Sequence, residues 1–430
     1  MKDCAGRVLM LVENSFPADV RVRNEAYSLS QAGYRVTVVA LRKPGEKRTE
    51  VVDGVRVYRI PRLTLFQKTS MAGSSLPWRY LTAVKTTIGY VSEYVYFTSA
   101  CLLASCFVAV VDAFDVIHAH NPPDSLFIVG ALHKMFGKKF VFDHHDLCPE
   151  LYMSRFGAKR GMITRALSVL EFLSYQLSDL TIVTNESYEQ IALSRGGLTN
   201  GRVMVVRNGP DLNRVRRVQP DESLKSRAGT VLVYLGMMNP QDGVDYLLAA
   251  LRVLVYQMGR TDFFCVLIGT GDSLEELKAA AVAADLQDYV QFTGYIPDED
   301  VRRYLSTADV CLDPNPSSPL NDVSTWIKVM EYMALGKPTI SFDLKETRFT
   351  ARKAAFYVPP NDVGAFAKAI ATLIDNPALR EDMGEYGKAR VEKELNWSVT
   401  SQNLLLAYRR LFPERDQDGS DYKVPARWMN

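Results

Sequence analysis

Short runs of aliphatic and β-branched residues alternate with amphipathic stretches along almost the whole chain. In the first half, seven such runs are expected to be strands, at residues 8–12, 35–40, 55–60, 116–119, 139–142, 180–183 and 204–206. Six more are expected at residues 231–235, 263–268, 290–292, 310–312, 339–342 and 355–358. Between them, residues 24–31, 164–176, 244–258 and 362–374 carry apolar residues at helical spacing. Alternation of strand and helix predicts parallel sheets covered by helices on both faces.

The two series of strands indicate an α/β protein with two Rossmann-like, doubly wound domains. The chain has 430 residues, of which 47% are hydrophobic, and this length is too great for a single core. Residues 207–228 are polar and include Pro210 and Pro220, as expected of a linker. We therefore expect an N-terminal domain over residues 1–207 and a C-terminal domain over residues 208–395.

Charge and cysteine content restrict the class of protein. The chain has 51 Lys and Arg against 49 Asp and Glu, which argues against a nucleic-acid binder that relies on bulk electrostatics. The six cysteines form no CxxC pair and stand mostly in apolar runs, so reduced thiols and a cytoplasmic location are expected. The first apolar run is too short for a signal peptide and is interpreted as a strand.

One segment suggests contact with a membrane. Residues 94–111 contain no charged side chain over eighteen positions, which is the lower limit for a membrane span. Because Thr98, Ser99 and Ser105 interrupt this segment, a buried or membrane-surface helix is favoured over a span. Residues 59–85 combine basic side chains (Arg59, Arg62, Lys68, Arg79, Lys85) with apolar ones (Leu65, Phe66, Leu76, Trp78). They are expected either to contact anionic lipid or to form a solvated insertion.

Polar residues and glycines follow nearly every predicted strand, at the edge where doubly wound sheets bind ligands. They predict a cleft between the two domains. His118 and His120 follow one strand, and Asp143, His144, His145 and Asp146 follow the next. Such a set can bind a metal, so metal-dependent hydrolysis is one alternative. However, no HExxH pair occurs, and the two groups lie on separate strands. Sugar or phosphate recognition is therefore favoured, with structural roles second and metal binding last.

Gly269 and Gly271 follow another apolar strand and precede Ser273 and Glu276, a capping-box pattern. Glycines at this place let a ligand approach the backbone before a helix begins. The pattern is neither a full GxGxxG nor a phosphate loop ending in Lys-Ser/Thr. A dinucleotide oxidoreductase and an NTPase are therefore disfavoured.

The stretch NDVSTWIKVMEYMALGKPTI, residues 321–340, predicts a loop, a short helix, a glycine stop and a strand. On a helical wheel, Ile327, Met330 and Ala334 share the core-facing side. Ser324, Lys328 and Glu331 cluster on a different side. The polar side of this helix is therefore a candidate binding site.

The chemistry of this polar side fits a nucleoside diphosphate. Backbone N–H groups at the start of the helix, near residues 323–325, can bind a diphosphate. Lys328 can add a charge-assisted contact to the same phosphates. Glu331 can accept hydrogen bonds from the two hydroxyls of a ribose, as an acidic residue does in dinucleotide folds. The ligand that needs all three groups is a nucleoside diphosphate that carries a sugar.

Several motifs together resemble those of a known family. They lie at residues 16–22, 115–121, 206–211, 243–248, 269–271, 292–296 and 331–338, with Glu25 and Gly236. In order and spacing they resemble the retaining family 4 glycosyltransferases of the GT-B fold, over nearly the whole chain. The resemblance implies transfer of a hexosyl or N-acetylhexosaminyl group from a nucleotide-diphosphate donor, UDP-sugar favoured, to a saccharide or lipid-linked saccharide. It implies no cofactor and no metal, and is most familiar from bacterial surface-polysaccharide and lipopolysaccharide assembly.

The resemblance also assigns roles to residues. Catalytic residues would be His120, which approaches the donor sugar, Asp322, Lys328 and Glu331. Donor-binding residues would be Asn208, Gly236, Gly269, Gly271, Tyr295, Ile296, Val323, Ser324 and Thr325. Residues that orient the acceptor or the sugar would be Arg21, Arg23, His144, Asp146 and Glu150. Trp397 and a helix at 401–411, within a final segment 396–430 that ends in a polar tail, would cross back onto the acceptor-binding N-terminal domain.

The sequence departs from the family pattern at three places. Val323 stands where a second Glu is usual, and Asp322, one residue away, is the candidate to replace it. Met237 and Asp242 stand where a phosphate-binding Arg and Lys are usual. Lys328, Arg207, Arg21 and Arg23 are the candidates to supply that charge. These departures leave two alternatives open: a nucleotide-sugar epimerase on the same fold, and a non-catalytic nucleotide-sugar-binding relative. A lipid-linked acceptor at the inner face of the cytoplasmic membrane is the expected setting.

Overall fold

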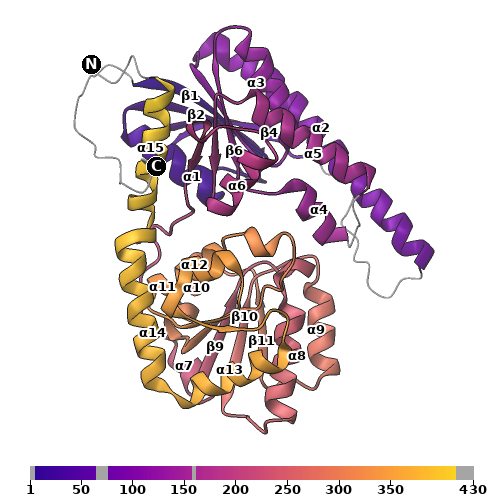
Figure 1. Cartoon of the computed structure of the whole chain (residues 1–430), viewed down its shortest axis with the longest axis vertical. Coiled ribbons are helices and arrows are strands. Elements are labelled where there is room, and N and C mark those ends of the chain that lie inside the picture. Colours follow the sequence, from indigo (N-terminus) through magenta and orange to yellow (C-terminus); the bar gives the residue numbers. More distant parts are fainter. Residues whose placement is uncertain (1–4, 64–75, 157–160, 413–430) are drawn as a thin grey trace.

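The computed structural model describes residues 5–63, 76–156 and 161–412, in which two α/β domains are stacked along the long axis of the molecule (Figure 1). All thirteen strands expected from the sequence are present. The upper sheet in Figure 1 is formed by the first half of the chain and the lower sheet by the second. The predicted pair of Rossmann-like domains is therefore confirmed.

The N-terminal sheet has eight strands. In spatial order these are β3 (Thr49–Val52), β4 (Val55–Pro61), β2 (Tyr34–Arg42), β1 (Gly6–Val12), β5 (Val116–His120), β6 (Lys139–His144), β7 (Leu180–Val183) and β8 (Val203–Val205). All pairs are parallel except β3 with β4. The edge strand β3 was missed in the sequence because it is short and polar. The Asp53-Gly54 turn before β4, where both residues have positive φ, is nevertheless a typical hairpin signal.

Helices cover both faces of this sheet. Val8, Met10 and Val12 of β1 face α1 (Val20–Gln31) and α15 (Trp397–Leu411), whereas Leu9 and Leu11 face the opposite side. That opposite side is covered by α2 (Leu76–Val111), α3 (Phe127–Lys134), α5 (Met162–Leu177) and α6 (Glu186–Ser194). The helix α4 (Cys148–Phe156) follows β6 on the side of the second domain (Figure 1). Because alternate residues of β1 point to opposite faces, the sheet carries one layer of helices on each face.

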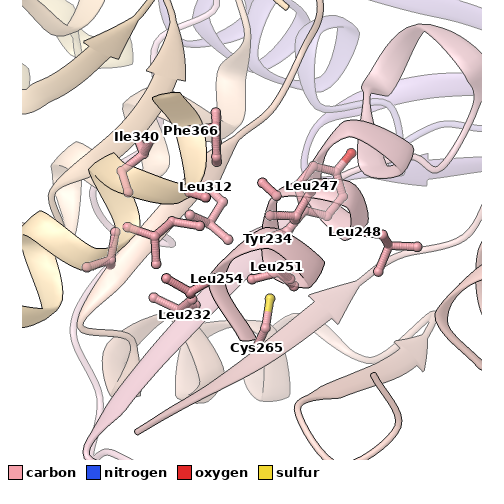
Figure 2. Packing of buried hydrophobic residues seen from close by; sticks show 14 of the residues in the cluster. Leu232, Tyr234, Leu247, Leu248, Leu251, Leu254, Cys265, Leu312, Ile340 and Phe366 are labelled. Atoms are coloured by element: carbon pink, nitrogen blue, oxygen red, sulfur yellow. The ribbon is translucent and has the colours of Figure 1, made fainter. Parts of the chain in front are cut away.

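The C-terminal sheet has six strands, all parallel. In spatial order these are β11 (Val290–Gly294), β10 (Phe263–Ile268), β9 (Thr230–Leu235), β12 (Val310–Asp313), β13 (Thr339–Phe342) and β14 (Ala355–Val358). The helices are α7 (Glu222–Lys225), α8 (Val244–Tyr256), α9 (Leu274–Ala283), α10 (Asp298–Thr307), α11 (Ile327–Ala334), α12 (Lys345–Ala351), α13 (Val363–Asp375) and α14 (Pro377–Arg390). Figure 2 shows Leu247, Leu251 and Leu254 of α8 packed against Leu232 and Cys265 of the sheet. Apolar positions at helical spacing thus bury one side of α8 in the core.

The last helix, α15, returns from the C-terminal domain to the first domain (Figure 1, yellow). It begins at Trp397, earlier than expected, because the Asn396 side chain accepts a hydrogen bond from the backbone N–H of Val399 at 3.2 Å and caps it. The Trp397 indole N–H donates to Ser28 Oγ of α1 at 2.9 Å. The expected polar tail, residues 413–430, lies outside the described residues. The end of the chain therefore packs on the domain formed by its beginning.

The apolar segment 94–111 is the C-terminal half of α2, a helix of 36 residues. On one side of the helix, Phe97, Cys101 and Val108 are buried against the sheet. On the other side, Leu103 and Val110 are 74% and 86% exposed. Within Thr87–Val111, the most apolar window of 18 residues has a mean hydropathy of 2.0 and is 28% buried, so length and composition alone would allow this helix to cross a membrane. The expectation of a buried helix thus holds for one side of α2 only.

The basic stretch before this helix is only partly described. Arg59 was expected among the lipid-facing cations, and this is wrong, because its buried guanidinium pairs with Glu46 at 3.2 Å and Glu50 at 2.6 Å. Residues 64–75, with Leu65, Phe66 and Lys68, lie outside the described residues, as do the side chains of Trp78 and Arg79. Lys85 is exposed. Of the expected cations, Lys85 thus keeps its place on the surface of α2.

The described cysteines are all free thiols. Cys101, Cys265 and Cys311 are buried, as expected from their apolar surroundings, whereas Cys106 on α2 is exposed. Burial raises the pKa of the Cys101 thiol well above its ordinary value. These buried thiols pack as small apolar side chains and offer no reactive thiolate.

Candidate active site

A buried ion pair between Arg21 and Asp143 lies at the centre of the N-terminal half of the site. The Arg21 Nε is 2.8 Å from one carboxylate oxygen of Asp143, and its Nη2 is 2.9 Å from the other. Nη2 also lies 3.1 Å from Glu25, one helical turn along α1. The helix α1 begins at Val20 with Asp19 as its cap, so Arg21 and Arg23 belong to its first turn and not to the loop expected from the sequence.

The carboxylates of this cluster differ in charge. Burial alone would raise the pKa of Asp143, but Arg21 and three neighbouring histidines lower it well below its ordinary value. Burial raises the pKa of Glu25 well above its ordinary value in spite of Arg21. At neutral pH, Asp143 is therefore the anion that pairs with Arg21, whereas Glu25 holds its proton more strongly than an ordinary carboxyl group does.

His118 and His120 stack on each other beside this pair, with ring centroids 4.3 Å apart. They share a face because they are two residues apart on β5. His120 Nδ1 is 3.1 Å from Asp143, and His118 Nδ1 is 2.9 Å from the hydroxyl of Tyr408 on α15. Burial, together with the neighbouring ring, lowers the pKa of His118 to about 3, and burial also lowers the pKa of His120. Both rings are therefore neutral.

His144 and Glu150, expected to orient the sugar, lie in a separate network. His144 Nδ1 is 2.8 Å from the Tyr175 hydroxyl, and its Nε2 is 3.2 Å from Glu171. Arg195 joins Glu171, at 2.9 Å, to Glu150, at 2.7 Å. Successive strand residues point to opposite faces, so His144 turns away from the Arg21 cluster.

The neighbours of His144 point to the cluster instead. His145 Nδ1 is 3.4 Å from Asp143, and although burial opposes its protonation, Asp143 raises its pKa. Asp146 is half-buried, and its backbone N–H and C=O both bond to the Asn121 side chain, at 3.1 and 2.7 Å. Asn121 thus joins the loops that follow β5 and β6.

A cavity of about 370 Å³ lies between the two domains. Its lining comes from the start of α1, the linker after β8, and the helices α10 and α11, and includes Arg21, Arg23, Asn208, Arg214, Tyr295, Asp298, Arg302, Ile327 and Glu331. Burial and the nearby Arg214 lower the pKa of Arg23, so guanidinium groups are crowded here. Such a cavity is suited to an anion.

Glu331 brings an acidic side chain to the cavity that the arginines line. Burial, together with Asp298, raises its pKa to about 7. Tyr295 lines the cavity and is 83% exposed, whereas Ile296 packs against the core below it. Ile327 was expected to face the core, but it lines the cavity instead. A carboxylate that is half-ionised near pH 7 therefore lines the same cavity as several cations.

The glycines after β9 and β10 serve loop packing. A Cβ atom on Gly269 would lie 1.8 Å from the carbonyl oxygen of Gly236, and one on Gly271 would lie 2.3 Å from that of Met238. Gly236 and Gly269 have φ values of 158° and 134°, which favour glycine. Gly236 and Gly269 therefore let two loops meet, a use that the sequence alone did not distinguish from contact with a ligand.

The helix expected near residues 323–325 begins later. A 3₁₀ turn spans Asn321–Val323, Ser324 and Trp326 are extended, and α11 begins at Ile327. Ser324 is thus not on the helix, and its hydroxyl donates to Leu320 O at 2.7 Å. The expected helix N-terminus at 323–325 is wrong, because polar residues at 321 and 322 resemble a helix cap but close the 3₁₀ turn. Contact of residues 323–325 with the donor stays a prediction.

Residues 323–325 instead contact the N-terminal domain. The Asn185 side chain, which caps α6, donates to Val323 O at 2.9 Å and to Thr325 Oγ1 at 3.0 Å. Asp322 accepts a hydrogen bond from Ser317 Oγ at 3.2 Å. This segment is therefore a contact between the two domains.

Lys328 is held in a buried pair. Its Nζ lies 3.2 Å from Asp313 Oδ1 and 2.6 Å from Asn315 Oδ1, and 4.7 Å from the centre of the Tyr234 ring. A Cβ on Gly236 would contact the Lys328 side chain at 3.7 Å. The lysine is therefore fixed next to the loop at Gly236, where the resemblance led us to expect a phosphate-binding Arg.

The four candidate cations differ in position. Arg21 and Arg23 line the cavity. Arg207 does not, because it pairs with Glu186 and Glu346 and lies 4.2 Å from the centre of the Phe349 ring. Sequence reasoning missed Arg214 and Arg302 at the cavity, and Glu25 and Tyr408 at the histidines. The i, i+4 spacing of Arg21 and Glu25 was the available signal for Glu25.

Comparison with known proteins agrees with this arrangement along most of the chain. Residues 18–209 match the family described as "Glycosyl transferase 4-like domain", and residues 229–376 match "Glycosyl transferases group 1". The chain belongs to the family 4 glycosyltransferases. The GT-B fold implied by the resemblance is thereby confirmed.

Relatives of this glycosyltransferase family differ widely in what they act on. The amylovoran biosynthesis glycosyltransferase of Erwinia amylovora is 27% identical over 42% of this chain and 44% of its own length. The phosphatidyl-myo-inositol mannosyltransferase of Mycolicibacterium smegmatis is 29% identical over 42% of this chain and 45% of its own length. The chain thus matches less than half the length of these two relatives. The solved Anabaena HepE in complex with UDP-glucose has a TM-score of 0.67 at 14% identity, and covers 93% of this chain and 99% of its own.

Glu25, His118, His120 and Asp143 of this family 4 glycosyltransferase have ligand atoms within 4.8 Å of one another. Glu25 was not among the metal ligands considered in the sequence. Arg21, however, contacts both carboxylates and supplies the positive charge that a cation would bring. The donor set is therefore better explained as an ion pair covered by neutral histidines.

Proposed function

We propose that the protein transfers a sugar from a nucleoside-diphosphate donor, UDP-sugar favoured, to a saccharide or lipid-linked saccharide. The observation that carries this proposal is the cavity between the domains, whose lining includes Glu331 as well as Arg23, Arg214 and Arg302. A ribose and a diphosphate need this combination of acceptor and cations. The UDP-glucose complex of Anabaena HepE, which shares the fold, supports the choice of donor.

In this proposal the arginines and Lys328 stabilise the leaving diphosphate, and no metal is needed. Preorganised charges of this kind act where negative charge develops in the transition state. The sugar keeps its anomeric configuration, because the acceptor attacks on the face that the departing phosphate leaves, and the phosphate takes the acceptor proton. The proposal includes a role in cell-surface polysaccharide synthesis at the inner face of the cytoplasmic membrane, and similarity to a glycosyltransferase of amylovoran biosynthesis supports a biosynthetic role.

His120 is fully buried and is not part of the cavity lining. Because Asp143 is ionised, the ring nitrogen that faces it carries the proton, and Nε2 is an acceptor. In the described structure this Nε2 has no hydrogen-bond partner. We propose that His120 holds the Asp143–Arg21 pair toward the cavity, and its direct contact with the donor sugar stays a prediction.

Thermal unfolding with UDP, GDP, ADP and TDP, with and without divalent metal, tests the donor site. A nucleotide at about 100 times its dissociation constant should stabilise the protein by roughly 2.7 kcal/mol. Glu331→Ala should weaken the binding of this nucleotide at least roughly tenfold, because a hydrogen bond to a charged acceptor is lost. Glu299→Ala, on the exposed side of α10, is the matched control.

The pH dependence of nucleotide binding gives a second test of the role of Glu331. Its pKa of about 7 means that the ionised acceptor is complete only above pH 7, so affinity for the nucleotide should rise from pH 6 to pH 8. The stability of the protein without nucleotide has the opposite pH dependence. Because the pKa of Glu331 is raised in the folded protein, its contribution to stability is lost as the pH rises through 7. Glu331→Gln should therefore be more stable than the wild type at pH 8.

In the thermal-unfolding experiment, a shift with zinc alone and none with any nucleotide would instead favour the metal-dependent hydrolase.

A non-catalytic relative is the second candidate, because both usual phosphate-binding cations are absent. Asp242 stands in the place of the lysine, and its buried carboxylate accepts a hydrogen bond from the Asn239 N–H at 3.0 Å. Binding of a nucleotide-sugar without release of UDP on any acceptor would support this candidate. Conversion of the sugar without an acceptor would identify an epimerase.

We propose that the exposed side of α2 contacts the membrane. Val95, Leu103 and Val110 lie on this side at helical spacing and are at least 60% exposed. The protein should therefore sediment with vesicles that contain anionic lipid at low salt, and Leu103→Gln with Val110→Gln should reduce this binding roughly tenfold or more. Val282→Gln, on α9 of the C-terminal domain and 55% exposed, is the control. Equal sedimentation of both variants would exclude α2 as the contact.

A further inference from the structure

An apolar groove lies between α2, α4 and α5, away from the nucleotide cavity. Its volume is about 90 Å³. Aromatic and aliphatic side chains from the three helices line it, among them Tyr90, Val91, Tyr94, Leu151, Tyr152 and Phe156. Most of these side chains are only half-buried. The groove is therefore open to solvent, although its surface is almost entirely apolar.

The groove reaches the strand ends of the candidate active site. Pro122 and Cys148 are part of its lining. Pro122 follows Asn121, and the Asn121 side chain contacts Cys148 Sγ at 3.8 Å and Asp146 O at 2.7 Å. The groove thus ends where the loops after β5 and β6 meet. An acceptor whose hydroxyl enters the cleft has its far end beside this groove.

A single charged side chain, Arg155, belongs to the described lining. Its guanidinium lies 5.1 Å from the centre of the Tyr90 ring and pairs with Asp272 of the C-terminal domain. An apolar channel with one cation at its rim is complementary to an amphipathic anion, because the chain is desolvated by the groove and the head group meets the arginine.

The groove is also continuous with the exposed side of α2. Val91 belongs to both, and Val95 and Leu103 follow it at helical spacing. In Figure 1, α2 runs from the end of the N-terminal domain, where α4 lies, to the far edge of that domain. A long chain that leaves the groove therefore meets further apolar surface.

We infer that this groove binds the hydrocarbon chain of the acceptor, next to its phosphate or diphosphate group, and that Arg155 contacts this group. The inference rests on the proposed glycosyl transfer and names the substrate class as a saccharide linked through phosphate to a long chain. The first carbons of the chain lie in the groove, and the rest extends along α2. In the complex, the Arg155 guanidinium exchanges Asp272 for the phosphate.

Calorimetric titration of the full chain with hexyl, octyl, decyl and dodecyl phosphate, each below its critical micelle concentration, tests this inference. Each added methylene that is buried should tighten binding roughly fourfold. Dodecyl phosphate should also bind more tightly than dodecyltrimethylammonium. Leu151→Trp fills the groove and should weaken dodecyl phosphate at least tenfold. Val91→Trp, at the exposed edge, gives the same test in a position that tolerates a large side chain.

Two variants separate the charge of Arg155 from its domain contact. Arg155→Gln removes the cation, whereas Asp272→Asn breaks the same ion pair and keeps the cation. Only Arg155→Gln should weaken dodecyl phosphate. Farnesyl phosphate has a branched chain of similar length to that of dodecyl phosphate. Comparison of the two affinities shows whether the groove prefers an isoprenoid chain or a linear one.

Affinity that is independent of chain length would overturn the inference, as would wild-type affinity in both tryptophan variants. Equal losses in Arg155→Gln and Asp272→Asn would also overturn it, since the arginine would then act through the domain contact alone. Nucleotide-induced stabilisation is the separate readout for the donor site. If UDP stabilises the protein but no chain binds, this inference fails and the proposed function stands. If none of the four nucleotides stabilises the protein either, both fail.

Discussion

Lys328→Ala is expected to lower the rate of UDP release from a UDP-sugar roughly 100-fold or more. The lysine is a fixed charge beside the loop at Gly236, and loss of one preorganised group that stabilises a developing charge typically has this effect. The same change leaves Asp313, whose side chain is fully buried, without its cation. The variant should therefore also lose about 3–5 kcal/mol of stability.

The double variant Lys328→Ala with Asp313→Ala separates the two effects. Removal of both charges should restore most of the lost stability, because no uncompensated charge remains buried. The rate should stay low. If the double variant releases UDP at the wild-type rate, Lys328 serves only to neutralise Asp313, and the leaving phosphate is stabilised by the arginines alone.

Arg21→Ala should lower the free energy of unfolding by about 3–5 kcal/mol, measured by urea denaturation at pH 7. Asp143 would remain ionised and fully buried, with His118, His120 and His145 as its main partners. Because Arg21 holds the pKa of Asp143 below its ordinary value, this stability is present above pH 4 and is lost as the pH falls. The difference between variant and wild type should therefore shrink in acid.

Arg23→Ala is the matched control for Arg21. Arg23 lies two residues further along α1 and lines the same cavity, but its guanidinium donates to Pro17 O at 3.3 Å and is crowded by Arg214. This substitution should cost much less stability and should weaken the nucleotide instead. Equal loss of stability in both variants would contradict a special role of the Arg21–Asp143 pair.

Periodicity in the sequence was sufficient to predict the fold. The strands are short apolar runs in parallel sheets, and such runs are recognised without knowledge of their partners. The start of α11 was placed too early, because Asn321 and Asp322 are good helix caps in sequence but close a 3₁₀ turn. The Asn185 side chain of the other domain contacts the end of this turn at Val323 O, and such a contact between distant residues is not visible in the local sequence.

The candidate site was predicted in part. Successive residues of a strand point to opposite faces, and this holds for a predicted strand as well. The sequence could therefore have placed His144 on the face opposite to Asp143 and His145. The pairs Arg21–Asp143 and His118–Tyr408 are 122 and 290 residues apart. One sequence contains no signal for such pairs, because many polar residues follow strands and only the packed fold selects among them.

The hydrogen bond between His118 and Tyr408 joins β5, in the first third of the chain, to the last described helix. Leu404, Ala407 and Tyr408 of α15 complete the apolar layer that covers one face of the N-terminal sheet. During synthesis, this face and the buried histidines remain uncovered until residues 397–411 have left the ribosome. The N-terminal half of the site is therefore finished last, after the whole C-terminal domain has been made. A protein truncated before α15 would contain every residue of the nucleotide cavity and still lack a closed first domain.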